Sequence, residues 1–164
     1  MRQSFKTWFL AALMLQVACS VALAQFRLDK SEGWKSFEGE GGLSVRYPAG
    51  IFVADAGPTE RGTGQRLKSQ DGRYEFAAYS LDNADSDTPR SFLQKNLLMS
   101  QGGLIYSRTT KKFFVISSIR KERIFYSRCN FAGRIHCIYL EYPQADKVAW
   151  DGIVSRVSYS LRPR

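Results

Sequence analysis

The chain has 164 residues, of which 44% are hydrophobic and 24% are charged. This length is typical of a single domain, and the apolar fraction is large enough to form one hydrophobic core, which excludes a chain that is disordered throughout. The formal net charge is +9 at pH 7, which favours partners that carry negative charge.

Residues 1–24 have the segment order of a secretory signal peptide. Two basic residues, Arg2 and Lys6, precede the apolar run 8–15, and the sequence Val-Ala-Leu-Ala ends at Ala24. A basic start, an apolar middle and small residues before the cleavage site are the three parts of such a signal. The order therefore predicts cleavage after Ala24.

Two alternatives to this cleavage stay open. Residues 8–24 are almost long enough to span a membrane as an uncleaved anchor. The sequence before Cys19 partly resembles a lipobox, which would make the chain a lipoprotein anchored at Cys19. With cleavage after Ala24, the mature chain is periplasmic or secreted and has no transmembrane helix.

The charge of the mature chain bears on its partners. Cleavage removes two of the 24 basic residues, so 22 basic and 15 acidic side chains remain, with a formal charge of +7. Outside the cytoplasm, a basic protein meets anionic lipid headgroups and acidic protein surfaces. Nucleic acid is therefore not an expected partner, in spite of the positive charge.

The predicted elements begin after a lead-in segment, residues 25–42, that ends in a glycine-rich loop. We expect a single domain over residues 43–164. Residues 43–47 alternate between apolar and polar side chains, as a half-buried strand does, and residues 51–53 continue in an extended conformation. Residues 55–64 are rich in glycine and polar side chains, and we interpret them as a mobile loop.

A hairpin is predicted next, because the strand-like runs 65–69 and 73–81 flank the step Asp71-Gly72. The polar segment 82–87 follows, with acidic residues at alternate positions as in a calcium loop. It lacks the downstream glycine and the glutamate that an EF-hand requires, so we interpret it as a solvated loop.

A helix is predicted from Thr88 to about Gln101. Thr88 is a favourable N-cap, and Pro89 is favourable at the first helical position. Four residues are spaced to share one face: Phe92, Leu93, Asn96 and Leu97. Glycines at 102 and 103 end the helix.

The second half of the chain predicts a meander and a closing helix. Four strand-like runs, 104–109, 112–119, 123–130 and 135–142, are separated by short turns, which is typical of antiparallel strands. After Pro143 the apolar residues recur at steps of three and four, as on an amphipathic helix. These residues are Val148, Trp150, Ile153, Val154 and Val157.

A turn at Gly133 predicts both a disulfide and the layers of the domain. With this register Cys129 lies opposite Cys137, and two cysteines in an oxidising compartment are expected to form a disulfide. Ile124, Tyr126, Ile138, Leu140 and Tyr142 then share one face, and Phe125, Cys129, Phe131, Ile135, Cys137 and Tyr139 share the other. Because both faces are apolar, each needs a helix above it. The expected fold is an α+β protein, an α/β/α sandwich with about six or seven antiparallel strands.

Two motifs in this arrangement resemble the Mog1/PsbP-like superfamily. The first is Leu43-Ser-Val-Arg-Tyr-Pro48. The second is Ile138-Tyr-Leu-Glu-Tyr-Pro143, which leads into a closing helix with Trp150 and Ile153-Val154. The similarity covers roughly residues 43 to 161. It implies the sandwich fold and favours an accessory role between proteins, and it transfers no functional residue because the superfamily is diverse in its partners.

The candidate binding residues are basic side chains at the turns of the meander. Lys111, Lys112 and Arg134 are expected at one end of the sheet, and Arg120, Lys121 and Arg123 at the other. Each group could bind an anionic headgroup or an acidic partner. The plain alternative is that charged turns keep the ends of the sheet solvated.

Catalytic candidates are few. His136 is the one histidine, and Ser117 and Ser118 interrupt an apolar strand where hydroxyls are unexpected. The chain lacks the common nucleophile-elbow, zinc and phosphate-binding motifs. We therefore predict no cofactor, no metal and no catalytic residue.

The first hypothesis is a non-catalytic, exported envelope protein that binds a protein partner or an anionic surface through its basic turns. The alternative is a small-ligand carrier or hydrolase-type enzyme with a pocket between sheet and helix. A third reading is an assembly subunit. The sequence leaves the oligomeric state open.

Overall fold

The computed structural model describes residues 33–97 and 103–163. The predicted signal peptide, with both alternatives to its cleavage, lies outside these residues, as does the predicted end of the first helix. In chain order the elements are β1 (Trp34–Glu38), η1 (Glu40–Gly42), β2 (Leu43–Pro48), β3 (Ala54–Pro58), β4 (Thr63–Lys68), β5 (Glu75–Leu81), α1 (Pro89–Leu97), β6 (Gly103–Thr109), β7 (Phe113–Arg120), β8 (Arg123–Ala132), β9 (Arg134–Pro143), η2 (Gln144–Asp146), α2 (Lys147–Ser160) and β10 (Arg162–Pro163).

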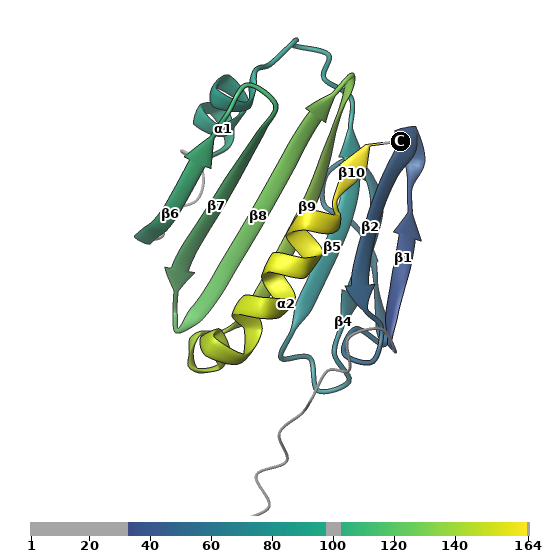
Figure 1. The fold of residues 1–164 in the computed structure, drawn as a ribbon, viewed down its shortest axis with the longest axis vertical. Helices are drawn as coiled ribbons and strands as arrows, with labels where there is room; N and C mark the ends of the chain where they lie inside the picture. Colours follow the sequence, from purple (N-terminus) through teal and green to yellow (C-terminus); the bar gives the residue numbers. More distant parts are fainter. Residues whose placement is uncertain (1–32, 98–102, 164) are drawn as a thin grey trace, which may run out of the picture.

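The described strands form two antiparallel sheets (Figure 1). The large sheet has seven strands in the order β3-β4-β5-β9-β8-β7-β6, and the small one has the order β1-β2-β10. Strands β6 to β9 follow one another as a meander, as the sequence predicts. Strand β5 pairs with β9, which joins the predicted hairpin β4–β5 to the meander.

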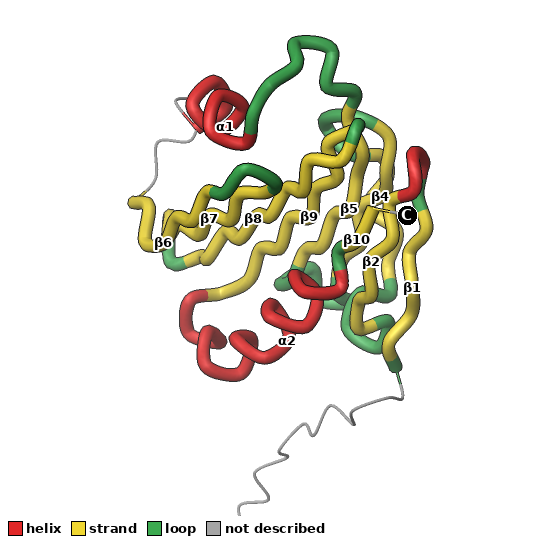
Figure 2. The backbone as a smooth tube through the Cα atoms, turned by 45° about the horizontal axis from the view of Figure 1, so that its top comes forward, coloured by secondary structure: helices red, strands yellow, loops and turns green. Residues whose placement is uncertain are grey.

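Helices lie on both faces of the large sheet, so the predicted α+β sandwich is confirmed. Figure 2 shows α1 on one side and α2, with the small sheet, on the other. The larger core lies on the α2 side and contains Leu43 and Val45 from β2, Leu140 from β9, and Trp150 and Val157 from α2. Each of these side chains is at most 4% exposed.

The hairpin β8–β9 has the register that the sequence predicts. Gly133 forms the turn with a φ of 74°, a conformation that glycine adopts without strain. Cys129 therefore pairs with Cys137, and the two form a disulfide with an S–S distance of 2.01 Å. Both cysteines are buried in the smaller core, below Leu93 of α1.

Strands β1 and β3 lie where the sequence analysis expected none. Residues 34–38, assigned to the lead-in segment, form β1, whose Trp34 and Phe37 pack against the larger core. Residues 54–58, expected to begin a mobile loop, form β3 and pair with β4. Glycines flank β1, and Gly57 and Pro58 lie within β3, which weakens the strand signal in both regions. Pairing with a neighbouring strand outweighs that local preference.

The face of α2 also differs in part from the prediction. Trp150, Ile153, Val154 and Val157 are buried, but Val148 is 88% exposed. The helix begins only at Lys147, so Val148 lies in its first turn on the side away from the sheet.

The described part of α1 covers only part of its face of the sheet. These nine residues are about 14 Å long, whereas the ten-residue strands β8 and β9 are about 33 Å long. Phe125 and Tyr139, expected below a helix, are consequently half-buried in an open groove.

Candidate functional site

Positive charge is concentrated on three neighbouring strands and the turns at their ends. Residues 103–134, which contain β6, β7 and β8, carry eight basic side chains and one acidic one, Glu122, whereas the rest of the chain carries 16 basic and 14 acidic ones. The eight are Arg108, Lys111, Lys112, Arg120, Lys121, Arg123, Arg128 and Arg134. We call residues 103–134 the basic edge, because β6 is the last strand of the large sheet.

The six predicted residues lie at the two ends of these strands. Lys111 and Lys112 occupy the β6–β7 turn, and Arg134 follows the β8–β9 turn at the same end. The backbone N–H of Phe131 donates to the carbonyl of Lys112 (2.8 Å), which holds that turn against the end of β8. Arg120, Lys121 and Arg123 flank the β7–β8 turn at the opposite end.

Two of these six residues form ion pairs, and Arg120 stacks on the Phe125 ring. Arg134 pairs with Asp82 (3.1 Å), and Arg123 pairs with Glu141. Lys111, Lys112 and Lys121 are exposed, and within residues 33–97 and 103–163 they make no ion pair. The three lysines are therefore the charges most open to a partner.

Two further arginines belong to the basic edge and are not among the residues predicted from the sequence. The guanidinium carbons of Arg108 and Arg128 lie 5.7 and 4.5 Å from the centre of the Phe113 ring. Arg128 Nε also donates to Asn130 Oδ1 (2.9 Å). In each strand the arginine follows a tyrosine by two positions, so Arg108 shares a face with Tyr106, and Arg128 with Tyr126. Only the pairing of β6, β7 and β8 shows that the two arginines gather around one ring.

Large apolar side chains lie beside this charge. Leu104, Ile105 and Tyr106 of β6 are 48%, 50% and 50% exposed. The register between β6 and β7 shifts between Leu104 and Tyr106, which marks a bulge. Exposed apolar residues on a strand at the rim of a sheet are typical of an interaction surface.

The β7–β8 turn is in an unfavourable conformation. Lys121 and Glu122 both have positive φ angles, 49° and 58°. A two-residue turn of this type prefers asparagine and glycine, because other side chains are strained there. Strain of this kind often accompanies functional positions.

A groove of about 560 Å³ lies on the other face, beside α1. Its floor comprises side chains that point the same way from adjacent strands: Arg66, Glu75, Ser118, Phe125, Tyr139 and Glu141. Asn96 of α1 lines one end, and Arg120 stands over the Phe125 ring at 4.8 Å.

The charges in the groove neutralise one another. Arg66 pairs with Glu75 (2.8 Å). Tyr139 donates to Glu141 Oε2 (2.7 Å), and burial, together with the Glu141 carboxylate, raises the pKa of Tyr139. The groove therefore offers aromatic and hydroxyl surface without an excess of charge.

Comparison with solved structures establishes the fold. The chain is similar to cyanobacterial PsbP (CyanoP) from Synechocystis sp. PCC 6803, with a TM-score of 0.56 over 80% of this chain and 93% of that one, at 12% identity. The fold is PsbP-like. No protein-family model and no curated protein sequence matches the chain.

The PsbP-like fold confirms the resemblance inferred from the sequence, and at this identity it carries no functional residue across. No helix in the described part of the chain is long and apolar enough to cross a membrane. Among the same residues, no three histidine, cysteine or acidic side chains gather as metal ligands would.

The structure places the catalytic candidates on opposite faces of the large sheet. Ser118 lines the groove, whereas its neighbour Ser117 points to the α2 face because side chains alternate along a strand. His136 also lies on the α2 face, fully buried, with Nδ1 2.9 Å from Ser80 Oγ. Ser80 Oγ donates to the carbonyl of Glu40 (2.8 Å), so this contact links η1 to the large sheet.

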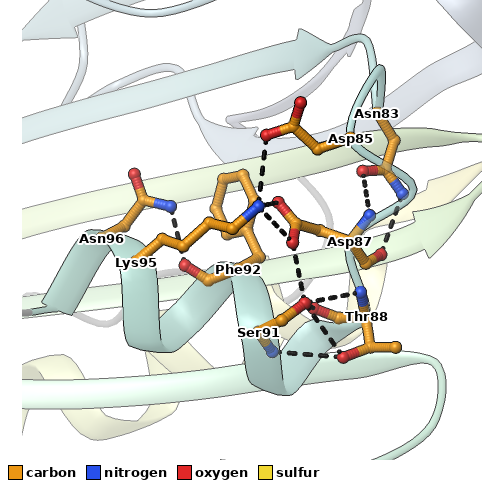
Figure 3. A network of polar contacts seen from close by, with 8 residues as sticks. All are labelled: Asn83, Asp85, Asp87, Thr88, Ser91, Phe92, Lys95 and Asn96. Carbon is orange, nitrogen blue, oxygen red and sulfur yellow. Dashed lines mark hydrogen bonds and ion pairs between the residues drawn. The ribbon is translucent and has the colours of Figure 1, made fainter.

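The acidic segment before α1 binds side chains of its own helix (Figure 3). Asp85 and Asp87 both pair with Lys95, at 3.2 and 2.8 Å. Hydrogen bonds from Lys95 and Ser91 lower the pKa of Asp87. Thr88 Oγ1 accepts from the backbone N–H of Ser91 (3.1 Å), as an N-cap does. These contacts give the segment a structural role.

Proposed function

We propose that the chain is an exported, non-catalytic module that binds a protein partner or an anionic envelope surface through its basic edge. One observation carries the proposal. Nearly all of the net charge, a balance of eight basic side chains to one acidic, lies in residues 103–134, on three adjacent strands and the turns at their ends. The outer strand, β6, exposes apolar side chains. A field of one sign draws partners of the opposite sign, and apolar contacts then hold them.

The distribution of the charge supports binding over solubility alone. Solubility requires only a net charge, whose place on the surface does not matter. Here the rest of the molecule is almost neutral, with 16 basic and 14 acidic side chains. The strained turn at Lys121 and Glu122 points the same way, since charged residues stand there in place of the asparagine and glycine that would stabilise it.

The disulfide supports the export. Structural disulfides persist in oxidising compartments such as the periplasm and the extracellular space. The bond between Cys129 and Cys137 is buried below α1, as is typical of a structural disulfide. With the signal sequence of residues 1–24, it favours a periplasmic or secreted chain.

The test is site-specific crosslinking in the native cells. A photo-crosslinking amino acid replaces Lys112 on the basic edge, and in a second variant it replaces Lys35, an exposed residue on β1 at the edge of the small sheet. We expect discrete adducts with a protein or an anionic lipid from position 112 and none from position 35. Charge reversal at Lys111 and Lys121 should make the adducts from position 112 less abundant. Equal labelling from both positions, or none from position 112, would refute the proposal.

The groove favours a second function, a small-ligand carrier. Its volume of about 560 Å³ is in the range of small-molecule sites. Native mass spectrometry of the protein from its own cells would then detect a bound molecule. The Ser118→Trp variant should lose this molecule, because the larger side chain fills the groove. The Lys112→Glu variant should keep it. The one histidine of the chain lies on the opposite face of the sheet from Ser118, so it does not serve as a base for that hydroxyl.

A further inference from the structure

We infer that β6 binds an acidic, extended segment of a partner protein as an added strand at the edge of the large sheet. This inference rests on the proposed function and states how the basic edge recognises its partner. It concerns the backbone of β6 as well as its side chains.

The edge of β6 has backbone groups to offer. Among the described strands, β6 has one neighbour, β7. After the bulge at Ile105, the residues from Tyr106 to Thr109 pair regularly with β7. In an antiparallel pair, alternate residues direct their N–H and C=O groups away from the partner strand, so this stretch offers donors and acceptors to a further strand. An extended peptide added there gains main-chain hydrogen bonds.

The side chains of β6 indicate which sequence fits. Tyr106 of β6 and Tyr126 of β8 are paired with the same residue of β7, and so are Arg108 and Arg128. Tyr126 donates to Ser158 of α2 (2.6 Å), so these four side chains lie on the α2 face. Ser107, between Tyr106 and Arg108, is on the other face. Every second residue of an added strand therefore lies beside Tyr106 and Arg108.

Positive charge on the α2 face of the basic edge favours acidic side chains in the partner strand. Arg108 and Arg128 flank the Phe113 ring, and Lys111 and Lys112 stand in the turn that follows β6. Neither arginine makes an ion pair with any residue that the structure describes. A partner strand with aspartate or glutamate at alternate positions places its carboxylates beside Arg108, while Arg128, two strands further in, adds to the positive field on the same face. The other side chains of the partner strand lie beside Leu104 and Ser107.

Two other occupants fit the observations less well. Inserting β6 into a bilayer would bring its unpaired backbone groups into hydrocarbon, which costs several kcal/mol for each group. A second copy of the chain, paired edge to edge through β6, would bring two basic edges together, and like charges repel. An acidic protein segment meets neither penalty.

The experiment uses the mature full-length chain and synthetic peptides of about eight residues, the length of a typical strand. One peptide alternates aspartate with valine, a second has the same composition with the aspartates grouped, and a third alternates lysine with valine. Two further peptides carry N-methyl groups on alternate amides of the first, one in each register. Fluorescence anisotropy measures the dissociation constants at low and high salt.

We expect the alternating acidic peptide to bind at least about tenfold more tightly than the grouped and basic peptides, and more weakly as salt rises. One N-methyl register should abolish binding, since it removes the donors of the added strand. Arg108→Glu should weaken binding about tenfold, and Lys35→Glu, on the edge strand of the small sheet, should leave it unchanged. Amide exchange in β6 should slow when the peptide binds.

Three results would overturn the inference. Equal binding of both N-methylated peptides would show that charge alone is recognised. Binding of all acidic peptides without slower exchange in β6 would place the site elsewhere. Binding of phosphatidylglycerol vesicles without binding of any peptide would identify a lipid surface. In each case the crosslinking from position 112 tests the proposed function separately.

Discussion

His136 is a buried titratable group, and its ring contacts Ser80, which in turn binds the backbone of η1. Burial lowers its pKa below the usual 6.5, and the positive charge of Arg134 lowers it further. Because the Ser80 hydroxyl proton is directed to the Glu40 carbonyl, Nδ1–H of the neutral ring is the donor to Ser80 Oγ. The folded state therefore favours the neutral ring.

This ring predicts the sign of a pH effect on stability. Below pH 6.5 the unfolded chain binds a proton that the folded chain binds only at lower pH, so the free energy of unfolding falls as the solution is acidified. The limit for one proton is about 1.4 kcal/mol per pH unit. Urea unfolding between neutral pH and mildly acidic pH measures the slope. His136→Gln should flatten it, and an unchanged slope in that variant would assign the effect to other groups.

Gly64 shows how closely two strands approach. A Cβ atom there would overlap the carbonyl oxygen of Ala78 and lie 2.6 Å from Tyr79 Cα. Both contacts are with backbone, which cannot move aside without disturbing β5. Gly64→Ala should therefore destabilise the protein by about 1–3 kcal/mol. Gly50→Ala is the matched control, because nothing lies within 4 Å of its added Cβ; thermal unfolding compares the two, and equal melting temperatures would contradict the prediction.

At the scale of elements, the disulfide constrains the hairpin β8–β9. It joins residues eight positions apart in the sequence and so restricts the unfolded chain. Cys129→Ala with Cys137→Ala should lower the free energy of unfolding by about 2–3 kcal/mol. Denaturant unfolding with and without a reductant checks the value. The reductant should have no effect on the double variant, and a shift there would mean that another part of the chain responds.

The β7–β8 turn gives a prediction of opposite sign. Lys121→Asn with Glu122→Gly places the preferred residues at the two positive-φ positions. We expect a gain of about 1–2 kcal/mol in the free energy of unfolding, because the strain of two left-handed residues is removed. Lys111→Asn, in the β6–β7 turn, is a control at a position without positive φ. A destabilised double variant would show that the present side chains make contacts that outweigh the strain.

For the whole molecule, export and binding are linked proposals. If residues 1–24 are a signal peptide, the protein from its own cells has the mass of a chain that begins at Gln25. Intact-mass measurement checks this. A lipid-modified Cys19 would give a heavier, detergent-dependent species, and the full 164-residue mass would indicate an uncleaved anchor. Either result would require a new account of how the basic edge reaches its partner.

The sequence predicted the meander and the hairpin β8–β9 well, for a local reason. Alternation of side chains and a glycine at the turn determine strand register within a hairpin, so opposing Cys129 and Cys137 followed directly from Gly133. Apolar residues at steps of three and four located both helices. Strands β1 and β3 were missed because each is short, contains few apolar residues, and forms only by pairing with β2 or β4.

The candidate site was predicted in part. The basic turns were visible in the sequence, because hairpin connectivity alone places Lys112 and Arg134 at one end of the sheet. The exposed edge of β6, the two arginines around Phe113, and the separation of His136 from Ser118 were not, since each depends on how the strands pair and on what covers each face.

The amino-acid sequence by itself therefore determined the order of most elements, the disulfide and the excess of positive charge, which are properties of neighbours along the chain. Only the tertiary structure decided that the described part of α1 leaves some of its face uncovered, that a groove opens beside it, and that β6 is at the rim of the described sheet with the charge around it. The physical reason is that burial and exposure depend on contacts between residues far apart in the sequence.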